Sequence, residues 1–267
     1  MIRPTWEQRI ERANELGEVY PFAAEILGFY VAVAQYQKTL FDYVGSAREK
    51  SKLPGVSFRQ CLDLPLLLPK FPGFLTVVKQ AAPPPLASLA EQIGAEGQAR
   101  WEKLLANFWS HGEEHELPET ESFFARAFLQ PYAEYVAGRL PQPPHTGNQA
   151  TCPVCDCEPV VAVLREEQLG AKRSFVCSFC ATEWEFARLI CPGCGEDRND
   201  ALCVYTSENI EHVRVDACDT CKTYIKAVDL TKNGLAVPIV DELATLPLTL
   251  WAQEHGYTKL QPNLMAA

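Results

Sequence analysis

The chain has 267 residues, of which 47% are apolar, and its 24 Lys and Arg against 34 Asp and Glu give a formal net charge of −10. This length and apolar content predict a globular protein with sizeable hydrophobic cores. Because nucleic-acid binding needs clustered basic residues, the acidic balance argues against a nucleic-acid partner and favours a basic peptide or protein. The N-terminus lacks the apolar stretch of a signal peptide and no long apolar run follows it, so we expect a cytoplasmic protein without membrane insertion.

The region before residue 145 predicts a helical domain. Apolar residues recur at helical spacing, prolines interrupt them, and a stretch rich in Pro and small polar residues follows at 140–152. The predicted helical segments are 5–44 with a break at Pro21, short helices within 62–89, and two longer helices at 87–109 and 119–139. We therefore place the first domain at residues 1–145.

The region after residue 145 changes to short β-branched and aromatic runs beside turns, a pattern that predicts strands. The predicted strands are 160–164, 174–177, 184–190, 212–215 and 224–228. A closing helix is predicted over 240–257, with Asp241 and Glu242 in its first turn and Pro247 placed to kink or split it. Together the two regions predict an α+β fold.

Ten of the eleven cysteines lie in this second region, and eight of them form four Cys-x-x-Cys pairs. The pairs are Cys152/Cys155, Cys177/Cys180, Cys191/Cys194 and Cys218/Cys221. Each pair places two sulfurs on one tight turn, and two such turns complete a tetrahedral site of four sulfurs. The sequence therefore predicts two metal ions, with Zn²⁺ or a single iron at each site, since thiolate ligands suit both.

The spacing of the pairs predicts which of them share an ion. The intervals between successive pairs are 21, 10 and 23 residues, and a zinc-ribbon or rubredoxin-like unit needs roughly 15–20 residues between its two turns. The outer intervals fit best, so we pair the first with the second and the third with the fourth. This pairing makes two tandem ribbons at residues 146–188 and 189–267, the second including the closing helix. The interleaved pairing, first with third and second with fourth, is the alternative.

Three further cysteines stand outside these pairs. Cys157 is interpreted as a bystander beside the first pair, with replacement of a ligand or a disulfide as the alternatives. Cys61 and Cys203 are interpreted as buried small apolar residues. A thioredoxin-type redox pair is disfavoured, because no βαβ pattern surrounds any of the pairs.

One other motif is typical of a catalytic metal site. His111, Glu114 and His115 match the H-x-x-E-H pattern of inverted zinc peptidases. Gly112 and Pro118, however, favour a helix end at this place, and no third ligand can be nominated. We therefore expect no catalytic residues here.

Five motifs follow one another between Cys152 and Leu264: CPVC, CSFCATEW, CPGCGE, CDTCKTYIKAV and DELATLPLTLWAQEHGY. Together they resemble the FdhE family, the accessory proteins of formate dehydrogenase maturation. The resemblance implies a helical N-terminal domain followed by two rubredoxin-like ribbons that bind iron through the eight paired cysteines. It also implies a partner, the molybdenum- or tungsten-containing catalytic subunit of respiratory formate dehydrogenase, which is exported by the twin-arginine route.

The resemblance also implies candidate residues for a partner-binding surface. They are Glu183, Trp184, Asp219, Tyr224, Lys226, Asp241 and Glu242, of which Trp184 and Tyr224 equally suit a ribbon core. Five positions depart from the expected family pattern. Glu242 and Thr249 stand where Asp is expected, Asp156 and Lys222 stand where Gly is expected, and Pro247 is not expected.

These observations predict a cytoplasmic maturation chaperone and not an enzyme. Metal ions would hold the ribbons rigid, and an acidic face would bind the immature dehydrogenase subunit, with its basic twin-arginine leader as the electrostatic target. Segment 182–190, TEWEFARLI, is predicted as one strand that joins the two ribbons and is where we look first for the partner. A rubredoxin-like iron redox protein and a zinc-ribbon nucleic-acid-binding module are the alternative functions.

Overall fold

The computed structural model describes residues 3–49, 52–111, 118–141, 148–167 and 170–265. The chain divides into two compact units, one formed by Gly28–Gln142 and the other by Met1–Leu27 together with Pro143–Ala267. The sequence does not predict that Met1–Leu27 belongs with the cysteine-rich region. The predicted boundary at residue 145 lies outside the described residues, as do Glu114 and His115 of the H-x-x-E-H motif.

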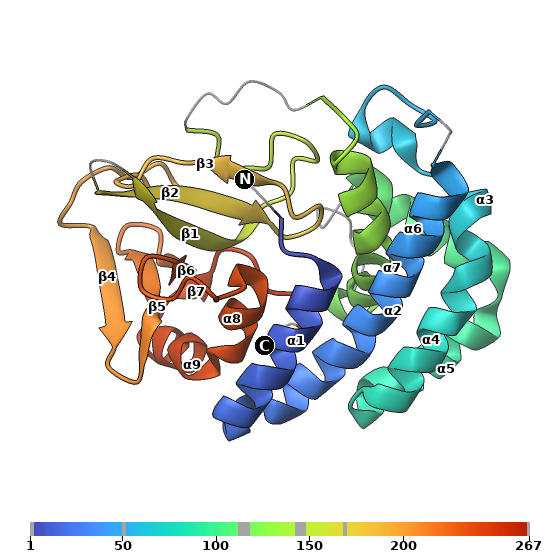
Figure 1. Cartoon of the computed structure of the whole chain (residues 1–267), viewed down its shortest axis with the longest axis horizontal. Helices are drawn as coiled ribbons and strands as arrows, with labels where there is room; N and C mark the ends of the chain where they lie inside the picture. The colour runs from blue at the N-terminus through green and yellow to red at the C-terminus, as the bar shows by residue number, and fades with distance from the viewer. Residues whose placement is uncertain (1–2, 50–51, 112–117, 142–147, 168–169, 266–267) are drawn as a thin grey trace. The chain divides into compact units, whose positions relative to one another are not determined.

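The first unit to be described, Gly28–Gln142, is helical (Figure 1). Its elements are α2 (Ala24–Arg48, which begins just before the unit), η2 (Phe58–Cys61), α3 (Leu64–Leu67), η3 (Leu68–Lys70), α4 (Phe71–Ala81), α5 (Pro84–Glu96), α6 (Gln98–His111) and α7 (Glu119–Ala137), where η marks a 3₁₀-helix. The short helices α3 and η3 confirm the prediction for the proline-rich segment, because each begins with a proline in its first turn.

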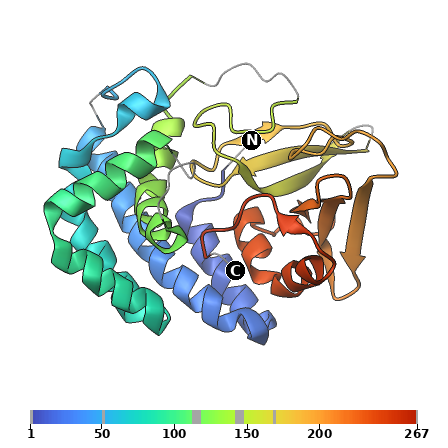
Figure 2. The same ribbon diagram turned by 180° about the vertical axis from the view of Figure 1, so that it is seen from behind.

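A glycine corrects the prediction of one long helix over 87–109. Gly97 has φ of 81°, a left-handed conformation that ends α5 and lets α6 begin in a new direction. The helices pack on an aromatic core, in which Phe71, Phe74 and Phe128 are fully buried and the ring centroids of Phe71 and Phe128 lie 4.9 Å apart. Figure 2 shows the helices of this unit side by side from behind.

The described residues of the second unit form a sheet, three α-helices and one 3₁₀-helix. Its elements are α1 (Trp6–Val19), η1 (Pro21–Ala23), β1 (Pro159–Glu167), β2 (Gly170–Cys177), β3 (Glu183–Glu185), β4 (Leu202–Ser207), β5 (Ile210–Cys218), β6 (Thr223–Asp229), α8 (Pro238–Ala244), α9 (Leu246–Glu254) and β7 (Thr258–Lys259). The predicted breaks at two prolines are confirmed: Pro21 opens η1 after α1, and Pro247 lies in the first turn of α9, after Thr245 has ended α8.

The strands form one continuous sheet in the order β3-β2-β1-β6-β5-β4, with β7 added to β6. Each ribbon contributes three antiparallel neighbours, and the two ribbons are joined by the parallel pair β1 and β6, in which Ala162 lies opposite Ala227. The strand predicted over 184–190 is wrong beyond Glu185, and the linker continues as a loop. Strand β4 and the shared sheet are not predicted by the sequence.

The two ribbons repeat one plan along the chain. Each begins with a Cys-x-x-Cys turn, continues as a two-stranded hairpin whose second strand ends on a cysteine (Cys177 in β2, Cys218 in β5), and closes with a second turn and a third strand. Side chains alternate across a sheet, so each strand has one face for the core. Val163, Val213 and Val228 pack with Leu248 of α9 into the core of this unit.

Helix α1 packs beside α8, as Figure 1 shows. The helix starts with a capping box: the Gln8 amide N–H donates to Thr5 Oγ1 at 3.2 Å, and the Thr5 N–H donates to Gln8 Oε1 at 2.9 Å. None of the helices in the described ranges combines the length and apolarity that a bilayer crossing requires.

Candidate metal centres

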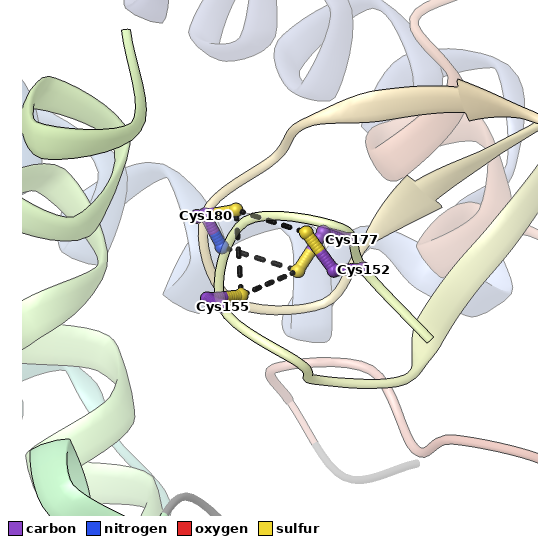
Figure 3. Close-up of side chains that lie close together, drawn as sticks. All are labelled: Cys152, Cys155, Cys177 and Cys180. Carbon is purple, nitrogen blue, oxygen red and sulfur yellow. Dashed lines mark hydrogen bonds between the residues drawn. The ribbon is translucent and has the colours of Figure 1, made fainter. Parts of the chain in front are cut away.

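The sulfurs of Cys152, Cys155, Cys177 and Cys180 converge at the base of the first ribbon (Figure 3). Cys155 Sγ lies 3.4 Å from both Cys177 Sγ and Cys180 Sγ, and Cys152 Sγ lies 3.5 Å from Cys180 Sγ. A disulfide would need about 2.05 Å, and none of the eleven cysteines, all within the described ranges, forms one. The four side chains are at most 1% exposed, so this site is buried.

The sulfurs of Cys191, Cys194, Cys218 and Cys221 converge in the same way at the second ribbon. Cys191 Sγ lies 3.6 Å from Cys221 Sγ, and Cys194 Sγ lies 3.7 Å from Cys218 Sγ. Here Cys194 is exposed and Cys221 is half-buried. The structure thus groups the pairs sequentially, first with second and third with fourth, and does not group them in the interleaved way.

Both sulfur sets fit a metal ion. Four thiolates at about 2.3 Å around a tetrahedral ion stand about 3.8 Å apart, close to the 3.4–3.7 Å separations found here. Four such ligands would complete the coordination of zinc or of a single iron and leave no position for a substrate. The eight cysteines would hold the two ions, and the donor set alone does not select the metal.

The residue after each Cys-x-x-Cys turn adopts a left-handed conformation. The φ angles are 63° at Asp156, 50° at Ala181, 76° at Gly195 and 57° at Lys222. In three turns its amide N–H donates to the carbonyl of the first cysteine, as from Gly195 to Cys191 at 3.0 Å. Asp156 and Lys222 therefore keep the backbone geometry of the expected glycines, and the metal turns force φ values that non-glycine residues rarely adopt.

A threonine accompanies the last cysteine of each site. Thr182 Oγ1 lies 3.1 Å from Cys180 Sγ, and Thr223 Oγ1 lies 2.9 Å from Cys221 Sγ. Backbone amides also point at sulfur, including those of Phe179 toward Cys177 and Gly193 toward Cys191, both at 3.3 Å. Such donors stabilise thiolates and orient them toward a metal. The sequence signal for these threonines is the repeated pattern Cys-x-x-Cys-x-Thr, at 177–182 and 218–223.

The hydrogen bonds around the second site lower one thiol pKa. Burial opposes ionisation of Cys221, but hydrogen bonds from the Thr223 hydroxyl and backbone outweigh it and bring the pKa of Cys221 to about 7. Glu196 also connects the two turns of this site, because the Thr220 hydroxyl donates to Glu196 Oε2 at 2.6 Å and the Arg198 amide donates to Oε1 at 3.0 Å.

Comparison with known proteins identifies the family. Residues 151–188 match the family model described as "FdhE, central domain", and residues 190–266 match "FdhE, C-terminal domain". The two matches follow in order and contain all eight paired cysteines. The chain belongs to the FdhE family.

Similar proteins extend the match to the rest of the chain. The "Protein FdhE homolog" of Aquifex aeolicus is 26% identical over 270 residues, which covers 97% of this chain and 94% of that protein. A "Protein FdhE homolog" of Shewanella sp. (strain MR-4) is 33% identical over 161 residues, 58% of this chain and 53% of its own. The crystal structure of the FdhE protein from Pseudomonas aeruginosa has the same fold, with a TM-score of 0.75 and 22% identity over 100% of this chain and 98% of that chain.

Most of the residues that were expected to form a partner surface are buried in the structure. Trp184, Tyr224, Lys226, Asp241 and Glu242 are at most 1% exposed, so they form the core and not a surface. Glu183 is also largely buried. Its carboxylate accepts a bidentate pair of hydrogen bonds from Arg165 at 3.0 and 2.9 Å. Asp219 remains partly accessible and accepts hydrogen bonds from Tyr257 at 2.8 Å and Lys222 at 2.6 Å.

Lys226 and Glu242 form a buried ion pair that fixes α8 and α9 to the sheet. Lys226 Nζ lies 2.9 Å from Glu242 Oε1 and donates to Thr249 Oγ1 at 3.0 Å. Lys259 binds the same carboxylate oxygen. Burial lowers the pKa of Lys226 to about 8, while the two lysine charges outweigh burial at Glu242 and lower the pKa of that carboxyl to about 2.

Asp241 anchors the first helix of the chain. Its carboxylate accepts hydrogen bonds from Arg12 of α1 at 2.6 and 3.0 Å and from the Val237 amide at 2.7 Å, and it lies 2.8 Å from His212 Nε2. Burial disfavours this carboxylate, but its partners lower the pKa of Asp241 below its ordinary value. No local sequence signal connects Arg12 with Asp241, because 229 positions separate them.

The remaining cysteines have separate environments. Cys61 is fully buried, as predicted, and its thiol lies 3.2 Å from the Ser57 carbonyl oxygen. Cys157 is half-buried and is not part of the four-sulfur cluster. Cys203 is not the buried apolar residue that the sequence predicts: it is half-buried in β4, with its sulfur 3.3 Å from Asp219 Oδ2.

Proposed function

We propose that this protein is a formate dehydrogenase accessory protein, a cytoplasmic maturation chaperone that binds the immature catalytic subunit and has no catalytic role of its own. The observation that carries the proposal is the ordered match to the FdhE central and C-terminal domains across both four-cysteine sites. The closed ligand sets support a non-catalytic role, because four thiolates leave an ion no open position for a substrate. Iron is the metal that we propose, with zinc as the alternative.

An acidic groove on α1 supports a basic peptide as the part of the partner that is bound. Glu7, Glu11, Glu15 and Glu18 are exposed and recur every three or four residues, so they form one stripe along the helix. A cavity of about 450 Å³ beside the stripe is lined by α1 and by residues 234–238. Leu235 of this wall is 84% exposed and offers an apolar contact.

The arginines of this groove cancel its charge only in part. Arg12 and Arg165 also line the cavity. Arg12 is bound mainly by buried Asp241 and also pairs with Glu15 at 3.2 Å, whereas Arg165 is bound by Glu183. The stripe of glutamates therefore keeps a negative potential that attracts cationic side chains. We propose that the twin-arginine leader of the immature subunit lies here.

Co-purification from anaerobic extracts tests the proposal. A tagged catalytic subunit with its leader is expected to recover this protein, and the triple variant E11K/E15K/E18K is expected to be lost from the complex. The variant E208K/E211K is the control for charge reversal on another surface, since Glu208 and Glu211 are also exposed but lie on the β4–β5 hairpin. Failure of the unmodified protein to co-purify would overturn the accessory role, while equal loss in both variants would move the partner away from α1.

The exposed second site favours a rubredoxin-like iron redox protein as a second candidate function. Electron transfer to a partner needs a metal near the surface, and Cys194 is exposed. Anaerobic purification followed by metal analysis and a visible spectrum decides this candidate. Reversible bleaching of an iron–thiolate spectrum would support it, and a colourless zinc protein would exclude it.

A further inference from the structure

A pocket lies beside the second four-cysteine site, on one face of the sheet. Its volume is about 150 Å³, and its apolar lining includes Leu189 of the linker between the ribbons, Pro192 of the Cys191/Cys194 turn, Leu202 and Val204 of β4, and Leu260. Cys191 and Cys218, two of the predicted metal ligands, also line it. The linker that the sequence singles out as a place for a partner is thus one wall of this pocket.

The pocket lies on the sheet face away from the core of its unit. Along β5, Val213 and Val215 point into the core that contains Leu248 of α9. Successive side chains of a strand point to opposite faces, so Arg214 and Asp216 point the other way and line the pocket. The face of β5 that lines the pocket therefore carries an arginine and an aspartate.

The charged side chains that line the pocket are mainly arginines. Arg173, Arg188 and Arg214 line it with one carboxylate, that of Asp216, while Cys191 and Cys218 would contribute thiolates to the neighbouring metal site. This carboxylate is bound mainly by Arg214, whose Nε donates to Asp216 Oδ1 at 2.8 Å. Its other oxygen lies 3.5 Å from both Arg214 Nη2 and Arg173 Nη2, too far for a strong hydrogen bond.

Arg173 is a buried cation with incomplete partners. It is 4% exposed, and its Nη1 reaches the carbonyl oxygens of Ala187, Arg188 and Ile190 only at 3.4 Å. Its Nε has no hydrogen-bond partner within the described residues. Burial also lowers the pKa of Arg173. A buried guanidinium without a close carboxylate is costly, and an anion in the pocket would remove that cost.

The pocket is reachable from solvent. Leu189 and Val204 on its rim are 60% and 53% exposed, although both are large apolar side chains. Two exposed apolar side chains beside Arg173 and Arg214 suit a ligand that carries an apolar body and one negative group.

We propose that this pocket binds an aliphatic carboxylate, with the carboxylate at Arg173 and Arg214 and the aliphatic chain against Leu189, Val204 and Leu260. The carboxylate supplies the acceptor that Arg173 Nε lacks, and the chain covers the exposed rim. The inference does not depend on the proposed accessory role, since it rests on the lining of the pocket alone.

An NMR titration of the ¹⁵N-labelled, metal-loaded protein tests the proposal. The probes are 4-methylpentanoate, its neutral amide, and acetate, which lacks the aliphatic chain. We expect the acid to bind at least about tenfold more tightly than its amide, because only the acid forms charged hydrogen bonds with the arginines. We also expect it to bind at least about tenfold more tightly than acetate, because acetate buries no aliphatic chain. Shifts should centre on Arg173 and Val204. Equal affinity for acid and amide would overturn the proposal.

Two substitutions at an exposed position keep the test independent of folding. V204E places a negative charge on the rim and is expected to weaken binding of the acid by about tenfold or more, whereas V204K is expected to retain or strengthen it. Equal affinities of the two variants would contradict a carboxylate site.

The source of the carboxylate is separated in the same experiment. N-acetyl-Gly-Gly-Leu, with a free C-terminal carboxylate, is compared with 4-methylpentanoate. Tighter binding of the peptide identifies a chain end as the source, and tighter binding of the free acid identifies a small molecule; either result supports an aliphatic carboxylate site. Failure of both probes to bind would overturn it.

Discussion

The two four-cysteine sites have the same ligands, the same left-handed turns and the same threonine after the last cysteine, yet they differ in burial. All four cysteines of the first site are buried, whereas the second site exposes Cys194 and leaves Cys221 half-buried. The first is enclosed by protein, and the second stands at the surface with a pocket beside it.

The residues inside the Cys-x-x-Cys turns explain this difference. The first site has CPVC and CSFC, and Phe179 is 1% exposed. The second site has CPGC and CDTC, in which Gly193 and Thr220 are exposed. A Cβ on Gly193 would approach Thr223 Oγ1 to 2.9 Å, so the second site has no room for the valine of the first. One motif thus gives an enclosed site or an accessible one according to two or three neighbouring residues.

The largest expected effect comes from removing the enclosed site. The double variant C177S/C180S is expected to lower metal content from two ions to one and to lower the free energy of unfolding by more than about 3 kcal/mol, because the binding energy of a structural ion is folding energy. C191S/C194S should also lose one ion but destabilise less. Metal analysis and thermal unfolding check both, with C157S as a control that keeps two ions. A larger fall in the free energy of unfolding for C191S/C194S than for C177S/C180S would contradict the claim that the enclosed site stabilises the fold more.

A smaller effect is expected when the enclosed site is made to resemble the exposed one. F179T removes a buried aromatic side chain. We expect the free energy of unfolding to fall by about 3 kcal/mol, near the lower end for such truncations. Metal exchange from the first site should also become faster. T220F is the matched change at an exposed position and should alter unfolding by less than about 0.5 kcal/mol. Denaturant unfolding measures both, and unchanged exchange in F179T would show that burial does not control access.

The threonines provide the smallest expected effect. T182V removes the hydroxyl 3.1 Å from Cys180 Sγ, and loss of a hydrogen bond to a metal ligand is expected to weaken binding by about tenfold. T223V removes the hydroxyl at 2.9 Å from Cys221 Sγ and should weaken binding less, since water can replace the donor at an exposed site. Competition with a coloured chelator measures each affinity. Equal losses of metal affinity in T182V and T223V would show that burial does not strengthen the effect of this hydrogen bond.

The sequence predicts the metal centres well because their determinants are local. Spacing within and between the cysteine pairs is enough to pair them, and prolines mark the breaks after α1 and after α8. It does not predict that β1 and β6 join the ribbons into one sheet, because parallel pairing of distant strands leaves no local pattern.

The candidate partner surface is predicted least well, and the reason is burial of charge. Charged residues are usually exposed, so Lys226 and Glu242 look like surface residues in the sequence, but each neutralises the other inside the unit. The pairing of Arg12 with Asp241 is equally hidden by its separation along the chain. Positions of buried ion pairs follow from the tertiary fold and not from local pattern.

The central claim is that the two metal sites are separate and differ in access. The most direct test monitors metal loss to a chelator over time by native mass spectrometry of the anaerobically purified protein. The account predicts two ions per chain and two phases of loss, separated at least about tenfold in rate because each 1.4 kcal/mol of local opening slows exchange tenfold. C194S should remove the fast phase, and C180S should remove the slow one. Loss of both ions in one phase, or a disturbance of both phases by either substitution, would contradict two separate sites of different access.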